Sequence, residues 1–275
     1  MEMKQRYDER HEGDNTPSVE IAIEYRKAIH NDEHDVNLSL IHYRGGEVEY
    51  LLGKEYCASE DPDDRATGAD ILAQLGWSDQ TYRDESINIL IPLLEDQDNY
   101  VIYCAAVALG HRAADSAIIN LIRHVDNPDP LIRNGVVFGL LSHEDDEAIS
   151  ALLKLAKDDD RDVRNWAVFG LGTQIDFDSP SIREALREAL GDVDYEVRGE
   201  GLVGLAKRGD PAVVIELFNE WRDDDVSILS LEAAEEIGDP RLFQRLNEFT
   251  QILTIEDDTY FANQLADAIT ACTPK

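Results

Sequence analysis

Apolar residues recur along most of the chain at helical spacing, in short runs separated by polar turns. Five of these runs resemble one another, at residues 69–76, 103–110, 134–141, 165–172 and 199–206, and a weaker sixth lies at 231–238. One apolar residue near the end of each run anchors the alignment: Leu75, Leu109, Leu140, Leu171, Leu205 and Ile237. Successive anchors lie 31 to 34 residues apart. Self-similarity at this period predicts a repeat architecture.

A second set of amphipathic runs alternates with the first, at 86–94, 117–125, 148–156, 181–190, 212–221 and 241–249. In these runs apolar residues recur at positions i, i+3, i+4 and i+7, which indicates a helix with one buried face. No stretch alternates with a period of two, so we expect no β-sheet. A repeated two-helix unit predicts an all-α fold: a right-handed α-solenoid of about six to seven helical hairpins.

The ends of a solenoid need caps, because each unit buries its apolar face only against its neighbours. We expect a disordered arm at residues 1–16 and a single solenoid over 17–275. Within it, 17–60 would supply capping helices and a degenerate repeat, 61–250 the repeats, and 257–271 a C-terminal capping helix.

Polar residues recur in the turns that precede the first set of runs. Asp stands eleven residues before the anchor in five repeats, at Asp64, Asp98, Asp129, Asp160 and Asp194. An Asp directly before a helix is a preferred N-cap, because its carboxylate accepts from otherwise unpartnered backbone N–H groups. Two further positions recur in the aligned repeats, and we call each such set of aligned residues a column. Thirteen residues before the anchor stand Asp96, Asn127, Asp158, Asp192 and Asp224. Seven residues before it stand Arg133, Arg164 and Arg198. We expect these two columns to link neighbouring repeats by charge-assisted hydrogen bonds.

The composition adds a strong negative charge. The chain has 58 Asp and Glu against 25 Lys and Arg, a formal net charge of −33 over 275 residues. Bare nucleic acid and anionic membranes require clustered cations, so we expect neither as a partner. The charge favours a basic protein partner, which it would attract over about 8 Å at physiological salt. Two alternatives stay open: the charge serves solubility alone, or it reflects a high-salt cytoplasm.

Little in the sequence points to chemistry. The three cysteines, Cys57, Cys104 and Cys272, form no CxxC pair and predict neither a zinc site nor a disulfide framework. This usage fits a reducing compartment, and the N-terminus has no apolar signal core, so we expect a cytoplasmic protein. The P-loop, G-x-S-x-G and HExxH motifs do not occur in the sequence. We therefore expect no enzymatic activity, no metal and no cofactor.

Several stretches carry a family likeness. The pattern D-x-D-x-x-V-R-x-x-A-x-x-x-L-G, at 158–172 and in a variant form at 191–206, resembles HEAT repeats of the phycobilin-lyase type. The stretches 43–61 and 163–172 look closer still to YibA-type HEAT-repeat proteins, which are associated with Rhs polymorphic toxins and regarded as immunity proteins. That resemblance implies an antidote that binds and neutralises a toxin domain, and the charge is compatible with a basic toxin. Such repeats serve many functions, so a general scaffold or assembly adaptor, or a bilin lyase-like enzyme, stays an alternative.

The resemblance also indicates where a partner would bind, because the helix with the V-R motif lines the concave surface of HEAT repeats. Positions two, five and six before the anchor should point away from the helix's own core, and acids outside the repeated columns should be unpaired. The selected partner-binding candidates are Tyr103, Asn134, Phe138, Asp162, Asn165, Trp166, Phe169, Glu196 and Glu200. Large aromatic residues are common anchors of interfaces. The alternative is that Phe138, Trp166 and Phe169 pack between neighbouring helices, and the oligomeric state stays open.

Overall fold

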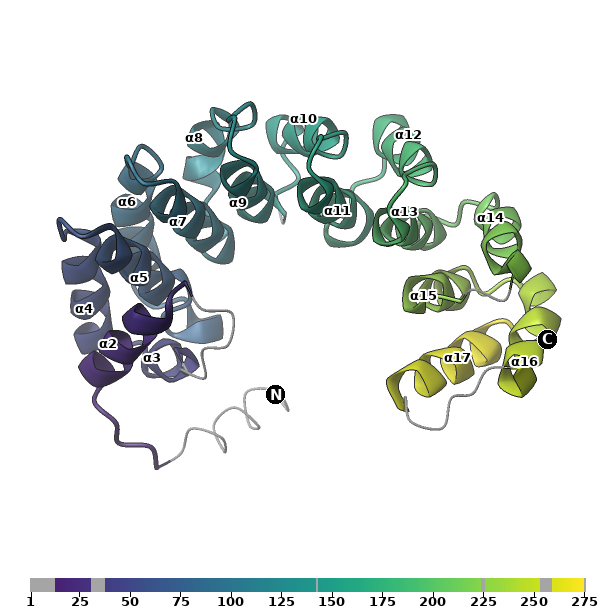
Figure 1. Ribbon diagram of the computed structural model, residues 1–275, viewed down its shortest axis with the longest axis horizontal. Coiled ribbons are helices and arrows are strands. Elements are labelled where there is room, and N and C mark those ends of the chain that lie inside the picture. The colour runs from purple at the N-terminus through teal and green to yellow at the C-terminus, as the bar shows by residue number, and fades with distance from the viewer. Residues whose placement is uncertain (1–12, 31–37, 142, 224–225, 253–258, 275) are drawn as a thin grey trace. The chain divides into compact units, whose positions relative to one another are not determined.

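The computed structural model describes residues 13–30, 38–141, 143–223, 226–252 and 259–274. Over these ranges the chain forms helices and no β-strand, and the prediction of an all-α solenoid is confirmed. The chain divides into two compact units, residues 1–140 and 141–275 (Figure 1). Each unit consists of consecutive helical pairs, and we call the later helix of each pair the second helix.

The first unit holds three such pairs among its described residues, after two N-terminal helices. Its helices are α2 (Ser18–Ala28), α3 (Ser39–Arg44), α4 (Glu47–Cys57), α5 (Pro62–Ala73), η1 (Trp77–Asp79), α6 (Arg83–Leu93), α7 (Asn99–His111), η2 (Asp115–Ala117), α8 (Ile118–Ile122) and α9 (Pro130–Leu140). The second helices α5, α7 and α9 pack in succession (Figure 1). Their core residues, among them Leu72, Leu109 and Leu140, are completely buried.

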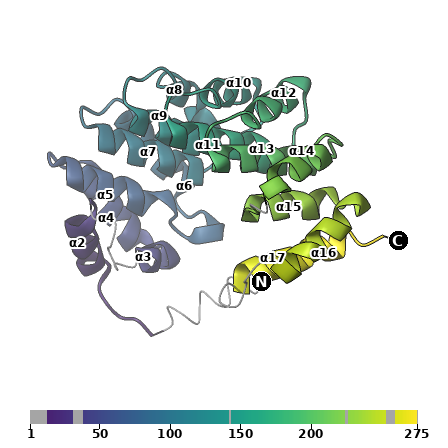
Figure 2. The ribbon, with the colours of Figure 1, turned by 45° about the vertical axis from the view of Figure 1, so that its right-hand side comes forward.

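The second unit repeats this plan with four pairs in its described part. Its helices are α10 (Asp146–Leu155), α11 (Arg161–Phe169), η3 (Gly170–Gln174), α12 (Pro180–Ala189), α13 (Tyr195–Lys207), α14 (Val213–Glu220), η4 (Trp221–Asp223), α15 (Ile228–Ile237), η5 (Pro240–Leu242), α16 (Phe243–Ile252) and α17 (Thr259–Ala271). The second helices α11, α13, α15 and α17 follow one another (Figure 2). A π-helical turn, η3, continues α11, and there the N–H of Ile175 donates to the carbonyl of Gly170 at 3.1 Å.

Two expectations for the chain ends fall partly outside the described residues. Of the arm expected at 1–16, residues 1–12 lie outside them. The remaining part contacts α3, because Arg44 donates to the carbonyl oxygens of Asp14 and Thr16 at 3.0 and 2.7 Å. At the other end, residues 257 and 258 are also outside, and α17 covers the rest of the expected capping helix.

Aspartates cap the second helices largely as predicted. Asp98, Asp160 and Asp194 each accept from two backbone N–H groups of α7, α11 and α13, at 2.9 to 3.3 Å. In the first repeat the prediction is wrong, because Asp61 caps α5 and Asp64 lies inside that helix. The alignment that used Leu75 as the anchor of this repeat is therefore three residues out of register with the other repeats. Helix α5 already ends at Ala73. Arg65 follows the cap Asp61 by four residues, just as Arg164 follows the cap Asp160.

The predicted link between repeats is confirmed for Arg164 and Asp192, and Arg65, which lies outside the predicted arginine column, makes the same kind of link to Asp96. Arg65 donates to both carboxylate oxygens of Asp96 at 2.7 and 2.8 Å, and Arg164 donates to those of Asp192 at 2.8 and 3.1 Å. Asp96 and Asp192 also accept the backbone N–H of the N-cap two residues later, at 2.9 Å. One carboxylate therefore shapes the turn and binds the preceding repeat. Asp224, the next member of this column, lies outside the described residues.

We expect Asp192→Ala to lower the free energy of unfolding by about 1.5 kcal/mol. The substitution removes both bonds from Arg164, in a pair whose side chains are only 15% and 13% exposed, and it leaves the N–H of Asp194 without its acceptor. Arg164 holds the pKa of Asp192 below its ordinary value, so this stability is present near neutral pH and is lost as pH falls through the lowered pKa. Urea denaturation across this pH range measures the effect. The exposed control Asp159→Ala should change stability by less than about 0.5 kcal/mol.

Candidate functional site

The first unit carries three of the sequence-predicted partner-binding residues, on neighbouring second helices. Tyr103 lies on α7, and Asn134 and Phe138 lie on α9, and all three are half-buried. The Tyr103 ring stacks on that of Tyr100 with centroids 6.0 Å apart. It also lies close to α9, because a Cβ at Gly135 would be 3.2 Å from the ring. Side chains from α7 and α9 thus form a partly exposed aromatic and amide surface.

The other six predicted residues lie on α11 and α13, which are neighbours in the second unit. The Trp166 and Phe169 rings meet edge to face, with centroids 5.5 Å apart and planes at 90°. Both side chains are half-buried, as is Asn165 beside them. Part of each ring is therefore buried and part is accessible. The alternative interpretation, in which these aromatic residues only pack between neighbouring helices, accounts for the buried part alone.

The expectation that Asp162 and Glu196 are unpaired is wrong. Arg161, the first residue of α11, donates to Asp162 at 2.6 Å, to Asp194 at 3.0 Å, and to Glu196. The Tyr195 hydroxyl donates to the other oxygen of Glu196 at 3.0 Å. The Arg161 side chain is 41% exposed, so this network lies at the surface of the unit. A partner that binds these acids would have to join or displace the Arg161 contacts.

Glu200 differs from the other predicted acids, because it is half-buried on α13 and faces like charge. Burial, followed by the carboxylates of Glu232 and Glu196, raises its pKa to about 7, against a smaller opposing effect of Lys207. Burial likewise raises the pKa of Glu232 on α15. Near neutral pH this helix pair therefore carries carboxyl groups that are costly to ionise. A cation from a partner would remove that cost.

We expect Glu200→Gln to increase the stability of the chain at alkaline pH by about 1.5 kcal/mol. The pKa of Glu200 is about 7 in the folded state and near 4.5 when the chain is unfolded. Between these two pH values the folded chain keeps the Glu200 proton, whereas the unfolded chain has lost it. The protonated carboxyl of Glu200 therefore supports folding in acid, and this contribution to stability is lost as pH rises through about 7. Gln resembles the protonated carboxyl, so the two proteins should differ little in acid and diverge as pH rises. Thermal unfolding followed at several pH values would reveal the divergence, and parallel curves would contradict it.

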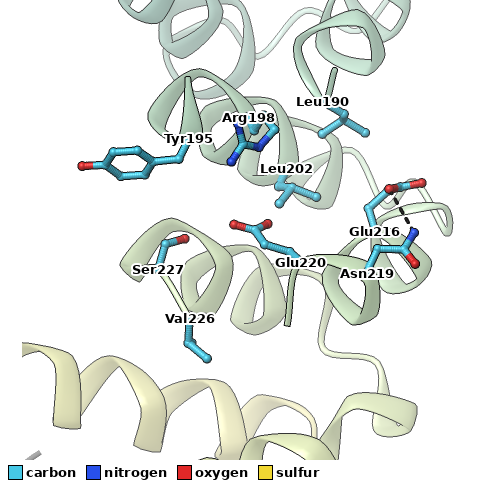
Figure 3. A pocket seen from close by; sticks show the side chains of 9 residues that line it. All are labelled: Leu190, Tyr195, Arg198, Leu202, Glu216, Asn219, Glu220, Val226 and Ser227. Carbon is cyan, nitrogen blue, oxygen red and sulfur yellow. Dashed lines mark hydrogen bonds between the residues drawn. The ribbon is translucent and has the colours of Figure 1, made fainter. Parts of the chain in front are cut away.

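A cavity of about 640 Å³ lies in the second unit, between α12, α13, α14 and the start of α15. Its lining residues are Leu190, Tyr195, Arg198, Leu202, Glu216, Asn219, Glu220, Val226 and Ser227 (Figure 3). None of the partner-binding residues predicted from the sequence lines this cavity. Sequence periodicity gives no signal for it, because it arises from the spacing between helices.

Other kinds of site find little support in the described part of the chain. There, no group of three or more His, Cys, Asp and Glu residues is arranged to hold a metal ion. No helix among these residues has the length and apolar character needed to cross a membrane. Cys57, Cys104 and Cys272 are buried free thiols.

The succession of helical pairs with aspartate-capped second helices has a counterpart among known families. The family profile described as HEAT repeats matches residues 51–141 and 149–238, which is more than half of the chain. The chain belongs to the HEAT-repeat family. The likeness at 158–172 and 191–206 is therefore confirmed at the level of the repeat.

Two solved structures place this HEAT-repeat protein among relatives of the same fold. The X-ray structure of YibA from Escherichia coli has a TM-score of 0.63 and 24% identity, over 98% of this chain and 97% of that one. The complex of CpcE and CpcF of phycocyanin lyase from Nostoc sp. PCC7120 has a TM-score of 0.50 and 16% identity, over 95% and 96%. At these identities the likeness shows the fold alone. No curated protein sequence matches the chain significantly.

The HEAT repeats also contain two structural arginines that the sequence analysis missed. Arg112, completely buried, donates to the carbonyl oxygens of Leu72 and Leu75 at 2.7 and 3.1 Å. Arg208 donates in the same way to three carbonyl oxygens in and just after η3, at 2.7 to 2.9 Å. Both therefore satisfy carbonyls at the C-terminal end of the preceding second helix. The sequence carries a signal for them, because each follows its anchor by three residues.

Proposed function

We propose that this HEAT-repeat protein is an immunity protein, which binds a basic toxin domain of the Rhs type in the cytoplasm and neutralises it without chemistry of its own. The observation that carries the proposal is the surface of α11 and α13. There the half-buried rings of Trp166 and Phe169 occur on the same helix pair as the acidic side chains of Asp162, Glu196 and Glu200. Aromatic anchors with a polar surround are typical of protein interfaces.

The charge of the chain supports a basic partner. With a formal net charge of −33, the protein would attract a cationic domain and speed its encounter. A lysine or arginine placed beside Glu200 would also relieve the repulsion between Glu200 and Glu232. Ionisation of Glu200 would then accompany binding, so the complex should become tighter as pH rises from about 6 to 8.

The toxin class comes from the resemblance of residues 43–61 and 163–172 to YibA-type proteins, and the E. coli YibA structure shares the fold over nearly the full chain. An antidote of this kind acts by covering the active surface of the toxin or by locking its fold. Buried aromatic anchors would set the dissociation rate, and the acidic surface would set the association rate.

Affinity isolation of the tagged protein from its native cells, with mass spectrometry, tests the proposal. We expect one near-stoichiometric basic partner that corresponds to the C-terminal domain of a toxin. Many substoichiometric partners would favour a general scaffold, and a bound chromophore would favour a bilin lyase-like enzyme. The absence of a partner under conditions in which a toxin encoded next to this chain is expressed would contradict the immunity function.

A further inference from the structure

The cavity of the second unit combines an acidic wall with an apolar one. Helix α14 supplies Glu216 and Glu220, four residues apart; the Glu220 carboxylate points toward Arg198, and that of Glu216 points toward Leu190 and accepts from Asn219 at 3.4 Å (Figure 3). Leu202, which is buried, and Leu190 supply apolar surface next to them. A ligand that fits this lining must be apolar along part of its length and polar at its end.

The charges that face the cavity determine the sign of that polar end. Arg198 on α13 lies across from Glu220 (Figure 3). Its Nη1 already donates to the carbonyl oxygens of Asp192 and Val193 at 2.9 and 3.1 Å, so part of its donor capacity is used by the backbone. Two carboxylates against one guanidinium leave the lining negative. An anionic ligand would meet repulsion from both glutamates, whereas a cation would meet a net attraction.

We propose that this cavity is a subsite for one basic side chain, arginine or lysine, of the protein partner, an inference that rests on the proposed function. The aliphatic stem would lie on Leu190 and Leu202, and the charged group would reach Glu216 and Glu220. A cavity of about 640 Å³ lies within the range of known ligand pockets, about 300–1,000 Å³, and accommodates such a side chain with adjoining backbone.

Titration of the full chain with N-acetyl-arginine amide, followed by amide NMR shifts, tests the subsite without a partner. We expect saturable shifts at Leu190, Asn219 and Ser227, which line the cavity. The uncharged N-acetyl-norleucine amide and the anionic N-acetyl-glutamate amide should not produce them. Shifts that spread over the acidic surface without saturation at these residues would overturn the proposal.

A matched pair of double variants separates the cavity from the overall charge. Glu216→Gln with Glu220→Gln should weaken binding of the arginine probe about fivefold or more. Glu147→Gln with Glu184→Gln removes the same charge from exposed positions of the same unit that do not line the cavity, and should leave the affinity unchanged. Equal losses in both double variants would show a diffuse charge effect and overturn the subsite.

The same variants distinguish a failure of the subsite from a failure of the proposed function. If the isolated toxin partner binds Glu216→Gln with Glu220→Gln as it binds the parent, while Trp166→Ala weakens it, the subsite is overturned and the proposed function stands. If the cavity variant weakens partner binding more than its control does, the subsite is supported. If no basic partner binds the parent chain, the proposed function fails and the cavity's role as a partner subsite fails with it, whatever the arginine probe shows.

Discussion

Replacing Arg112 with methionine is expected to lower the free energy of unfolding by about 3 kcal/mol or more. Arg112 is completely buried and supplies the hydrogen bonds of the Leu72 and Leu75 carbonyls and of the Gln80 side chain. Methionine fills similar volume and donates to none of them, so two buried carbonyl groups lose these donors. Burial lowers the pKa of Arg112 to about 10, which still leaves it charged near neutral pH.

Urea denaturation followed by circular dichroism gives this loss directly. Arg123→Met is the matched control, because Arg123 is exposed at the end of α8, and it should change stability by less than about 0.5 kcal/mol. Arg208→Met should destabilise the chain in the same direction, since the Arg208 side chain is only 7% exposed and donates to the carbonyls of Leu171, Gly172 and Ile175. Parent-like stability of Arg112→Met would show that the carbonyls find other donors.

Trp166→Ala is expected to weaken binding of the proposed basic partner about 30-fold, or about 2 kcal/mol. The half-buried indole meets Phe169 edge to face, so truncation removes a large aromatic side chain from the surface proposed to bind the partner. The loss should appear mainly as faster dissociation. Biolayer interferometry with the isolated partner measures both rate constants.

Trp77→Ala is the control for this prediction. Trp77 is an exposed tryptophan, 37% accessible, in η1 of the first unit, outside the second helices. The Trp77→Ala variant should bind the partner with the same affinity as the parent chain. Circular dichroism must show that Trp166→Ala is folded before its affinity is interpreted. A folded Trp166→Ala variant with parent-like affinity would place the interface elsewhere.

Most of the fold follows from local rules that the sequence displays openly. The period of the apolar runs identifies the helical pairs, and an aspartate fixes the start of several second helices, as Asp98, Asp160 and Asp194 show, whereas Ser227 caps α15. The rule fails in the first repeat, where a Ser-x-Asp-Pro turn replaces the Asp-x-Asp turn and Asp61 becomes the cap. An alignment based on apolar residues alone cannot decide whether Leu72 or Leu75 is the anchor of this repeat, because both leucines are completely buried.

The chemistry of the candidate surfaces is harder to predict, because it depends on contacts between repeats. Asp162 and Glu196 fall outside the repeated columns and for that reason were expected to be unpaired, yet Arg161 binds both. Arginine occurs at this helix position in one repeat only, so no column reveals it. The pKa of Glu200 depends on burial and on Glu232 in the next repeat, 32 residues away in the sequence. Side chains that are distant in the chain decide these properties, and a single sequence does not show which of them meet.

A growth assay with the proposed partner, a basic Rhs-type toxin domain, tests the central claim most directly. Cells that express the toxin domain alone should stop growing, and co-expression of the parent chain should restore growth. Co-expression of folded Trp166→Ala should restore it only at higher protein levels, as expected when affinity falls about 30-fold. Failure of the parent chain to restore growth, with both proteins present in the cell, would contradict the account.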